Sequence, residues 1–272
     1  MIKKRSNIVR ITIGFFIAAL HMVPFYIVLM VSLKSKSDLS SKWSPPIGPF
    51  LGNYIAALTS GNLPRAMFNT VFVTAFALTL TLIIASLAAY PLARIKSRLS
   101  RLITNITLVV MMIPTLSILV PLYITFINLK LINTYIGLIL VLTTFGLPLS
   151  IFLLSNFIRE MPVDLEHAAF IDGCTEIGAY FKIIVPLQAP ALASASILTG
   201  VKMWNDYRFA RYLLQKTQMK TIAVTISQYF NDFASEINIA AAAAILGIIP
   251  IVVIFLVLQK HFVSGLSEGA LK

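Results

Sequence analysis

Residues 66–93 read AMFNTVFVTAFALTLTLIIASLAAYPLA, a stretch that contains no charged residue. A helix needs about 20 apolar residues to cross the ~30 Å hydrocarbon core of a bilayer, so this stretch is long enough to span a membrane. Other runs of the chain lack charged residues in the same way: 11–33, 102–129, 131–158, 183–201 and 237–259. The sequence therefore predicts one all-α transmembrane domain over 1–272, with six spans at about 9–33, 68–93, 103–128, 136–158, 190–213 and 239–260.

The composition supports a membrane protein with helical spans. Apolar residues make up 58% of the chain and charged residues only 12%, whereas soluble domains carry roughly 25% charged residues. A transmembrane β-barrel would show segments of ~9–11 residues in which polar and apolar residues alternate. The apolar runs in this chain are continuous, so helices are the better interpretation.

Lysine and arginine residues indicate how the spans are oriented. The 22 such residues divide nearly equally between the two sides of a chain with six spans. The densest clusters lie beside helix ends on the side of the N-terminus, at positions 3–10 and 94–101. Because positive residues beside membrane spans favour the cytoplasmic side, we expect both termini and the loop over 159–189 to be cytoplasmic. The net charge of +12 is then partly an orientation signal. Nucleic-acid binding is a poor alternative explanation of this charge, because the sequence shows no soluble basic domain.

The sequence offers no support for catalytic chemistry in this chain. Its three histidines lie in different regions and Cys174 is its single cysteine, so a metal site built on several thiolates is excluded. No Gly-x-x-x-x-Gly-Lys-Ser/Thr loop is present to hold nucleotide phosphates, and no Gly-x-Ser-x-Gly motif occurs. We therefore expect no catalytic residue, no metal and no cofactor in this chain, and energy for any work must enter elsewhere.

The longest of the predicted cytoplasmic loops has its own helix signals. Pro162 suits the first turn of a helix, Asp164 and Glu166 complement the positive end of the helix dipole, and Gly173 suits the helix end. These signals predict a short helix from about 163 to 172. Its predicted face has two alanines at the centre, which allow another backbone to approach closely: Leu165, Ala168, Ala169 and Asp172. On these mechanics alone, a docking surface and packing against the chain's own helices are equally good interpretations.

The same loop contains a spaced motif. His167-Ala168-Ala169 is followed after three residues by Gly173, and after nine more by Ile183, any residue, Val185 and Pro186. This pattern resembles the EAA loop in the membrane subunits of ATP-binding-cassette (ABC) importers, where Glu-Ala-Ala, Gly and Ile-x-Leu-Pro have the same spacing. Here His replaces the family's Glu and Val replaces its Leu, and whether Glu166 compensates for the missing carboxylate is open. The resemblance continues over nearly the whole chain, through 69–70, 88–94, 112–114, 118–123, 131–137, 204–207 and 262–272.

Together these segments are typical of the carbohydrate-uptake branch of binding-protein-dependent ABC importer permeases, which are subunits of the bacterial or archaeal inner membrane. The resemblance implies a six-helix permease that is not an enzyme and that forms the path for sugar import with a second permease subunit. It also implies a cytoplasmic ATPase dimer that binds the ATP, and an extracytoplasmic sugar-binding protein. The residues expected to couple to the ATPase are His167, Ala168, Ala169, Asp172, Gly173 and Pro186.

A second candidate site lies toward the end of the fifth predicted helix. Lys202 and Asp206 are four residues apart and so would share one helix face, with Trp204 and Asn205 beside them. A charge inside a bilayer costs about 2.5–3.5 kcal/mol on insertion scales, so the two should pair or face a watery cavity. The four residues would then line the substrate path, with Trp204 and Asn205 offering stacking and hydrogen-bonding groups to a sugar. The alternative is that Lys202 reaches the outer interface and Trp204 belongs to the aromatic belt.

Two other functions are open on the sequence. Within transport, the substrate could be another solute, such as a peptide or a phosphorylated polyol. From a different class, the chain could be a membrane-embedded enzyme or a self-sufficient channel, and either of these would need neither an ATPase nor a binding protein.

Overall fold

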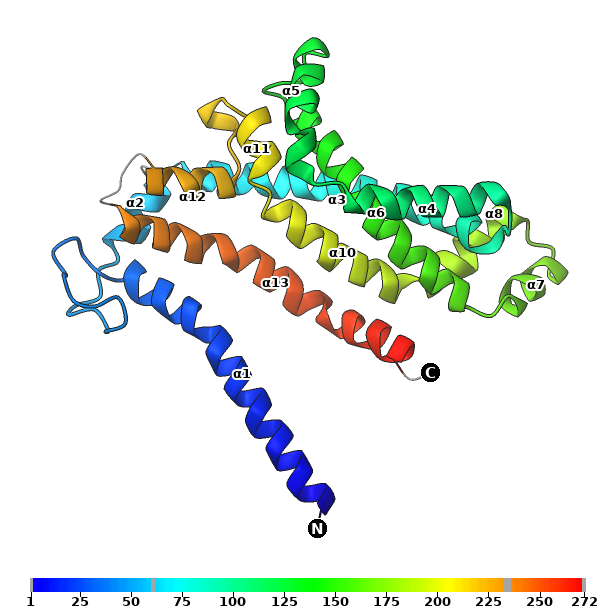
Figure 1. Cartoon of the computed structure of the whole chain (residues 1–272), viewed down its shortest axis with the longest axis horizontal. Helices are drawn as coiled ribbons and strands as arrows, with labels where there is room; N and C mark the ends of the chain where they lie inside the picture. Colours follow the sequence, from blue (N-terminus) through cyan, green and yellow to red (C-terminus); the bar gives the residue numbers. More distant parts are fainter. Residues whose placement is uncertain (1, 60–61, 232–235, 271–272) are drawn as a thin grey trace. The chain divides into compact units, whose positions relative to one another are not determined.

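The computed structural model describes residues 2–59, 62–231 and 236–270 (Figure 1). These residues form helices and turns, and none of them lies in a β-strand, which confirms the all-α prediction. The chain divides into two compact units. The first contains the residues up to Pro64 together with Thr225–Ile249, and the second contains Arg65–Val224 together with the residues from Pro250 onward.

Within the described ranges, four helices are each long and apolar enough to cross a membrane. They are α1 (Ile2–Ser32), α3 (Leu63–Arg94), α6 (Tyr135–Glu160) and α13 (Ile237–Ala270). Two bent helix pairs also meet this test, and counting each as one span gives six. The shorter helices are α2 (Gly52–Thr59), α7 (Asp164–Ile171), α11 (Arg208–Leu213) and α12 (Ile222–Asn231), with a 3-10 turn at Thr217–Met219.

The two bent pairs break beside prolines. In the first pair, α4 (Arg98–Met112) leads through a 3-10 turn (Thr115–Ile118) to α5 (Leu119–Asn128), with a bend of 94°. Ile113 ends α4 in an extended conformation, as a residue before proline prefers, and Pro114 has no N–H to continue the helix. The span predicted at about 103–128 therefore contains a break at Pro114.

In the second pair, α10 (Ala189–Trp204) follows a bend of 66°. Before the bend lie α8 (Glu176–Ala179), a π-helical turn (Tyr180–Ile184) and α9 (Val185–Leu187). Within the predicted span over 190–213, α10 ends at Trp204, where the Asn205 side chain donates to the carbonyl oxygen of Val201 at 2.9 Å and the Asp206 side chain accepts from the N–H of Ala210. A separate helix, α11, begins four residues later.

The larger core of the second unit packs α6 against α3, α10 and α11. Its buried side chains include Val73, Leu138, Leu142, Met203 and Phe209. Gly146 on α6 permits this packing, because a Cβ at that position would lie 2.7 Å from Met203 Cε and 2.9 Å from Thr199 Cγ2. The hydroxyl of Ser150 forms a hydrogen bond with that of Thr199 at 3.1 Å. Small residues and paired hydroxyls of this kind are typical of helix contacts in membranes.

Three residues from the segments that resemble ABC importer permeases form hydrogen bonds to the connection between α11 and α12. Asn69 Nδ2 donates to two carbonyl oxygens of the 218–220 turn at 2.9 Å each. Thr70 Oγ1 accepts from the N–H of Ile222 at 2.8 Å. The Asn133 side chain, on a residue with φ = +56°, accepts from the N–H groups of residues 215 and 216. These residues therefore have a structural role in the second unit.

In the first unit, Lys34 organises the loop between α1 and α2. Its side chain is buried, and Nζ donates to the carbonyl oxygen of Ser41 at 2.8 Å and lies 3.9 Å from the Asp38 carboxylate. The Lys34 carbonyl oxygen accepts from Nδ2 of Asn53 on α2 at 2.8 Å and from Nδ2 of Asn238 on α13 at 2.9 Å. Polar side chains thus hold a long loop that has few apolar contacts.

One face of α4 is apolar, although Arg98, Arg101 and Asn105 are also exposed on this helix. No residue of this helix is buried, and its exposed side chains include Leu99, Leu102, Ile106, Val109 and Met112. In water, a continuous apolar face of this size would favour aggregation. In a membrane it contacts lipid or another membrane helix, so this surface agrees with the transmembrane fold.

Candidate coupling hairpin and substrate cavity

The short helix predicted in the loop after α6 is present as α7 (Figure 1). Asp164 and Glu166 lie in its first turn, where their charges complement the helix dipole. At the other end Gly173 has φ = +82°, and the N–H groups of Gly173 and Cys174 donate to the carbonyl oxygens of Phe170 and Ala169. This pair of bonds is a Schellman cap, in which a left-handed glycine turns the chain. The chain continues into α8, and we call residues 161–187 the coupling hairpin.

A buried ion pair attaches α7 to the end of α3. Glu166 is 4% exposed, and its Oε1 lies 2.6 Å from both Nε and Nη2 of Arg94. Tyr90, one turn earlier on α3, donates its hydroxyl proton to Oε2 of Glu166 at 2.9 Å. Arg94 also donates to the carbonyl oxygen of Met161 at 3.2 Å. Both carboxylate oxygens are bonded within the chain, so Glu166 does not offer a carboxylate to a docking partner in place of His167.

The residues predicted to couple to an ATPase differ in exposure. Ala169 is 4% exposed and packs the hairpin against its own unit. The others are exposed: His167, Ala168, Asp172, Gly173 and Pro186. Ala169 therefore fits the interpretation that this face packs against the chain's own helices. Ala168 is exposed and fits the interpretation that the face docks on a partner.

Large apolar side chains are exposed on the coupling hairpin. Ile171 is 86% exposed and Ile177 is 72% exposed. The set also includes Leu165, Phe170 and Phe181, and we call these five residues the apolar hairpin surface. They lie in the loop predicted to be cytoplasmic, where exposed apolar groups are unfavourable unless another surface covers them. The hairpin thus combines an anchored inner side with an apolar outer side.

A chain of buried polar groups leads from the hairpin to the bend before α10. The hydroxyl of Tyr180, in the π-helical turn, forms a 2.7 Å hydrogen bond with that of Ser86 on α3, and its ring packs 5.3 Å from the ring of Tyr90. Ser86 Oγ also accepts from Nε2 of Gln188, which is fully buried at the bend. Turns of π-helix are frequent at functional sites. Sequence reasoning missed this chain, because its hydrogen bonds join residues 94 and 102 positions apart.

A cavity of about 430 Å³ lies in the second unit between α4, α6, α10 and α11. Small-molecule sites typically have volumes of ~300–1,000 Å³. Three of the residues predicted for the substrate path line this cavity, namely Lys202, Asn205 and Asp206. Trp204 does not: it is buried and lines a separate cavity of about 70 Å³ with Leu78.

Lys202 and Asp206 face the cavity but do not pair with each other. Because α10 ends at Trp204, they do not share a helix face as predicted. Asp206 is 7% exposed, and its Oδ2 accepts from the N–H of Ala210 on α11 at 3.0 Å. In the part of the chain that the structure describes, Nζ of Lys202 has no hydrogen bond or ion pair.

The remaining walls of the cavity combine aromatic and hydrogen-bonding groups. The rings of Phe145 and Phe209 stack with centroids 4.9 Å apart. Arg208 donates from Nη1 to the hydroxyl of Thr115 at 3.1 Å, whereas the hydroxyl of Thr199 is buried and bonded to Ser150. Apolar walls with a few polar groups suit a small polar molecule that has apolar faces. Among the described residues, no three His, Cys, Asp or Glu side chains are placed to hold a metal ion.

The spans, the hairpin and the cavity define a membrane subunit of a transport system. The chain belongs to the family of binding-protein-dependent transport system inner membrane components, whose sequence profile matches residues 77–268. Its family is therefore one of transporter permeases and not of enzymes, as the sequence predicted.

Individual relatives agree with the family. The chain is 40% identical over 257 residues to the melibiose/raffinose/stachyose import permease protein MelC of Bacillus subtilis, covering 94% of this chain and 93% of that one. It is 34% identical to the trehalose transport system permease protein SugB of Mycobacterium tuberculosis, covering 92% of each. A crystal structure of a bacterial ABC transporter involved in the import of the acidic polysaccharide alginate contains a similar chain, with a TM-score of 0.81, 24% identity, and coverage of 94% of this chain and 96% of that one. This similarity confirms the predicted permease fold.

Proposed function

We propose that this chain is one of two permease subunits of an ATP-driven sugar importer. Its six spans and the coupling hairpin then make one permease domain over 1–272, which forms the translocation path together with a second permease. The relatives MelC, an import permease for melibiose, raffinose and stachyose, and SugB, a permease of a trehalose transport system, support the substrate class. The half-buried ring of Phe145 and the hydroxyl of Thr115, which both line the 430 Å³ cavity, also suit a sugar.

The observation that carries the coupling role is the exposed apolar hairpin surface on a firmly anchored hairpin. Arg94 and Glu166 fix the position of α7 on α3, while Ile171 and Ile177 are left open. We infer that this surface docks on a cytoplasmic ATPase dimer, with His167, Ala168, Asp172, Gly173 and Pro186 around it. ATP is bound by that dimer, since this sequence has no phosphate-binding loop.

Contacts within the chain connect the coupling hairpin, on which the ATPase dimer would act, to the cavity. A displacement of α7 pulls on α3 through the ion pair between Glu166 and Arg94. The π-helical turn moves with them, because Tyr180 is bonded to Ser86 and Ser86 to Gln188. Gln188 precedes α10, and at ~1.5 Å per residue it lies about 20 Å from Lys202 at the other end of that helix. Rigid-body motion of packed helices can then alternate the side to which the cavity opens.

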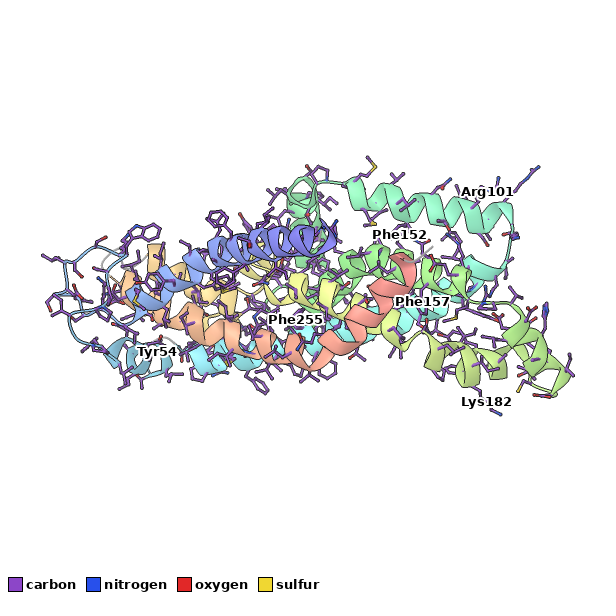
Figure 2. The ribbon with its side chains drawn as sticks, turned by 90° about the horizontal axis from the view of Figure 1, so that it is seen from below. Tyr54, Arg101, Phe152, Phe157, Lys182 and Phe255 are labelled. Atoms are coloured by element: carbon purple, nitrogen blue, oxygen red, sulfur yellow. The ribbon has the colours of Figure 1, made fainter. Side chains whose placement is uncertain are left out.

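Basic residues support a cytoplasmic position for the hairpin. Arg101 and Lys182 lie at one end of the second unit, together with the hairpin (Figure 2). Arg94 and Arg159 end α3 and α6 at the same end. Positive residues beside spans favour the cytoplasm. We therefore place the chain in a bacterial or archaeal cell membrane with both termini and the hairpin inside, and with the loop between α1 and α2 on the side of an extracytoplasmic sugar-binding protein.

Purification of the chain with its partners tests this function. We expect a second permease and an ATPase to co-purify with it, and ATP hydrolysis by the complex in vesicles to rise about 5-fold or more when a sugar-loaded binding protein is added outside. The matched control is the same binding protein without sugar. Stimulation by a peptide-loaded binding protein alone would contradict the sugar assignment, and solute flux without any ATPase would contradict the importer.

A further inference from the structure

The cavity between α4, α6, α10 and α11 has an excess of positive charge. Lys202 and Arg208 both line it, and Asp206 is the single carboxylate among its lining residues. Lys202 and Arg208 are exposed, whereas Asp206 is buried. The three side chains together have a formal charge of +1, and both cations face the space in which a substrate would lie.

Among the described residues, neither cation is in an ion pair, although the charge of Asp206 attracts that of Arg208 at longer range. One oxygen of Asp206 is bonded to the N–H of Ala210, and Asp206 forms no ion pair with Lys202 or Arg208 in the described part of the chain. Arg208 gives one N–H to Thr115, a neutral hydroxyl, and keeps further N–H groups for another acceptor. Unpaired cations within a membrane protein are unfavourable unless a partner or water meets them.

The helix dipoles account for the cation at Lys202 but not for the one at Arg208. Lys202 lies in the last turn of α10, where the negative end of the helix dipole favours a cation. Arg208 is the first residue of α11, where the positive end of the dipole disfavours one. A neutral sugar would need neither cation, because Asn205 and Thr115 already line the cavity with hydrogen-bonding groups.

We propose that the cavity binds a sugar that carries a carboxylate, such as a uronic acid, with Lys202 and Arg208 holding the anion. This inference rests on the proposed sugar import and specifies the charge of the substrate. The planar guanidinium of Arg208 matches the two oxygens of a carboxylate. The half-buried ring of Phe145 offers an apolar face to the sugar ring and stacks on the buried ring of Phe209. A net charge of +1 matches a single carboxylate better than a doubly charged phosphate.

Binding of matched sugars to the intact transporter complex tests the proposal. The probes are galacturonate and galactose, which differ by one carboxylate, with glucose 6-phosphate as a third probe, all at constant ionic strength and without the binding protein. We expect the wild-type complex to bind galacturonate roughly 10-fold or more tightly than galactose. Lys202→Met and Arg208→Met should each reduce this ratio toward one, because each removes a charge-assisted hydrogen bond.

The ratio of two affinities is the readout because an unfolded fraction of a variant lowers both affinities equally. Arg211→Met is the matched control, since Arg211 is an exposed cation on α11 that does not line the cavity, and its ratio should equal that of the wild type. Equal binding of galactose and galacturonate by the wild type would overturn the proposal and leave sugar import intact. Tighter binding of glucose 6-phosphate than of galacturonate would overturn the carboxylate assignment. Failure of every sugar to bind would overturn both this inference and the sugar assignment.

Discussion

Replacing Ile171 with aspartate is expected to weaken association with the ATPase by roughly 30-fold or more while leaving the chain folded. The Ile171 side chain is 86% exposed, so the free energy of unfolding should change by no more than ~0.5 kcal/mol. In the docked complex the new carboxylate would be buried without a partner. Central interface residues contribute about 2 kcal/mol or more, which corresponds to roughly a 30-fold loss of affinity. The measurement is co-purification of the ATPase with the tagged permease, together with stimulated ATP hydrolysis.

Ile47→Asp is the matched control for this substitution. Ile47 is also 86% exposed, but it lies in the loop between α1 and α2, on the side proposed to be outside. We expect Ile47→Asp to retain the ATPase. A complex that still contains the ATPase after Ile171→Asp would contradict docking through the hairpin. Gly173→Arg should also uncouple transport, but it adds backbone strain at φ = +82° and is therefore a less selective test.

Replacing Arg94 with methionine should uncouple ATP hydrolysis from transport by releasing the hairpin from α3. Loss of one partner from a buried ion pair costs about 3–5 kcal/mol, because the remaining charge is left without compensation. Here the remaining charge is the Glu166 carboxylate, whose side chain is 5% exposed. If the variant loses this free energy from the contact between α7 and α3, the ratio of attached to detached hairpin falls roughly 100-fold. The measurements are sugar uptake and stimulated ATP hydrolysis in reconstituted vesicles.

Two further variants separate the ion pair from a general effect of charge. Arg98→Met removes an exposed arginine only four residues away and should leave uptake near the wild-type rate. The double variant Arg94→Met with Glu166→Gln removes both charges and should recover part of the lost uptake, because no charge is then buried alone. No recovery in the double variant would show that Arg94 does not act through Glu166.

Long apolar helices could be predicted from the sequence, but the residues at which they end or bend could not. Uncharged runs identify spans because the thickness of the bilayer sets a minimum length of apolar helix. The ends depend on single side chains, such as Asn205, which turns back to Val201, and Asp206, which bonds to Ala210 on the next helix. A hydropathy pattern does not depend on such hydrogen bonds. The predicted span over 190–213 therefore includes residues beyond the end of α10.

The candidate site was predictable where it depends on local signals. Gly173 was expected to end a short helix, and it does so in a left-handed conformation. The pair between Glu166 and Arg94 was not predictable, because its residues are 72 positions apart and each resembles an ordinary charge at a helix end. Trp204 was grouped with Lys202 by proximity in sequence, although successive helical side chains point about 100° apart.

Cross-linking from a single cysteine tests the docking of the hairpin most directly. Cys174 is the chain's only cysteine, so a Cys174→Ser background accepts one new cysteine at a chosen position. In the assembled complex, Ile171→Cys is predicted to form a cross-link to the ATPase subunit in high yield, and Ile47→Cys to form none. A complex that hydrolyses ATP in response to its loaded binding protein, but in which Ile171→Cys gives no cross-link to the ATPase, would contradict the account.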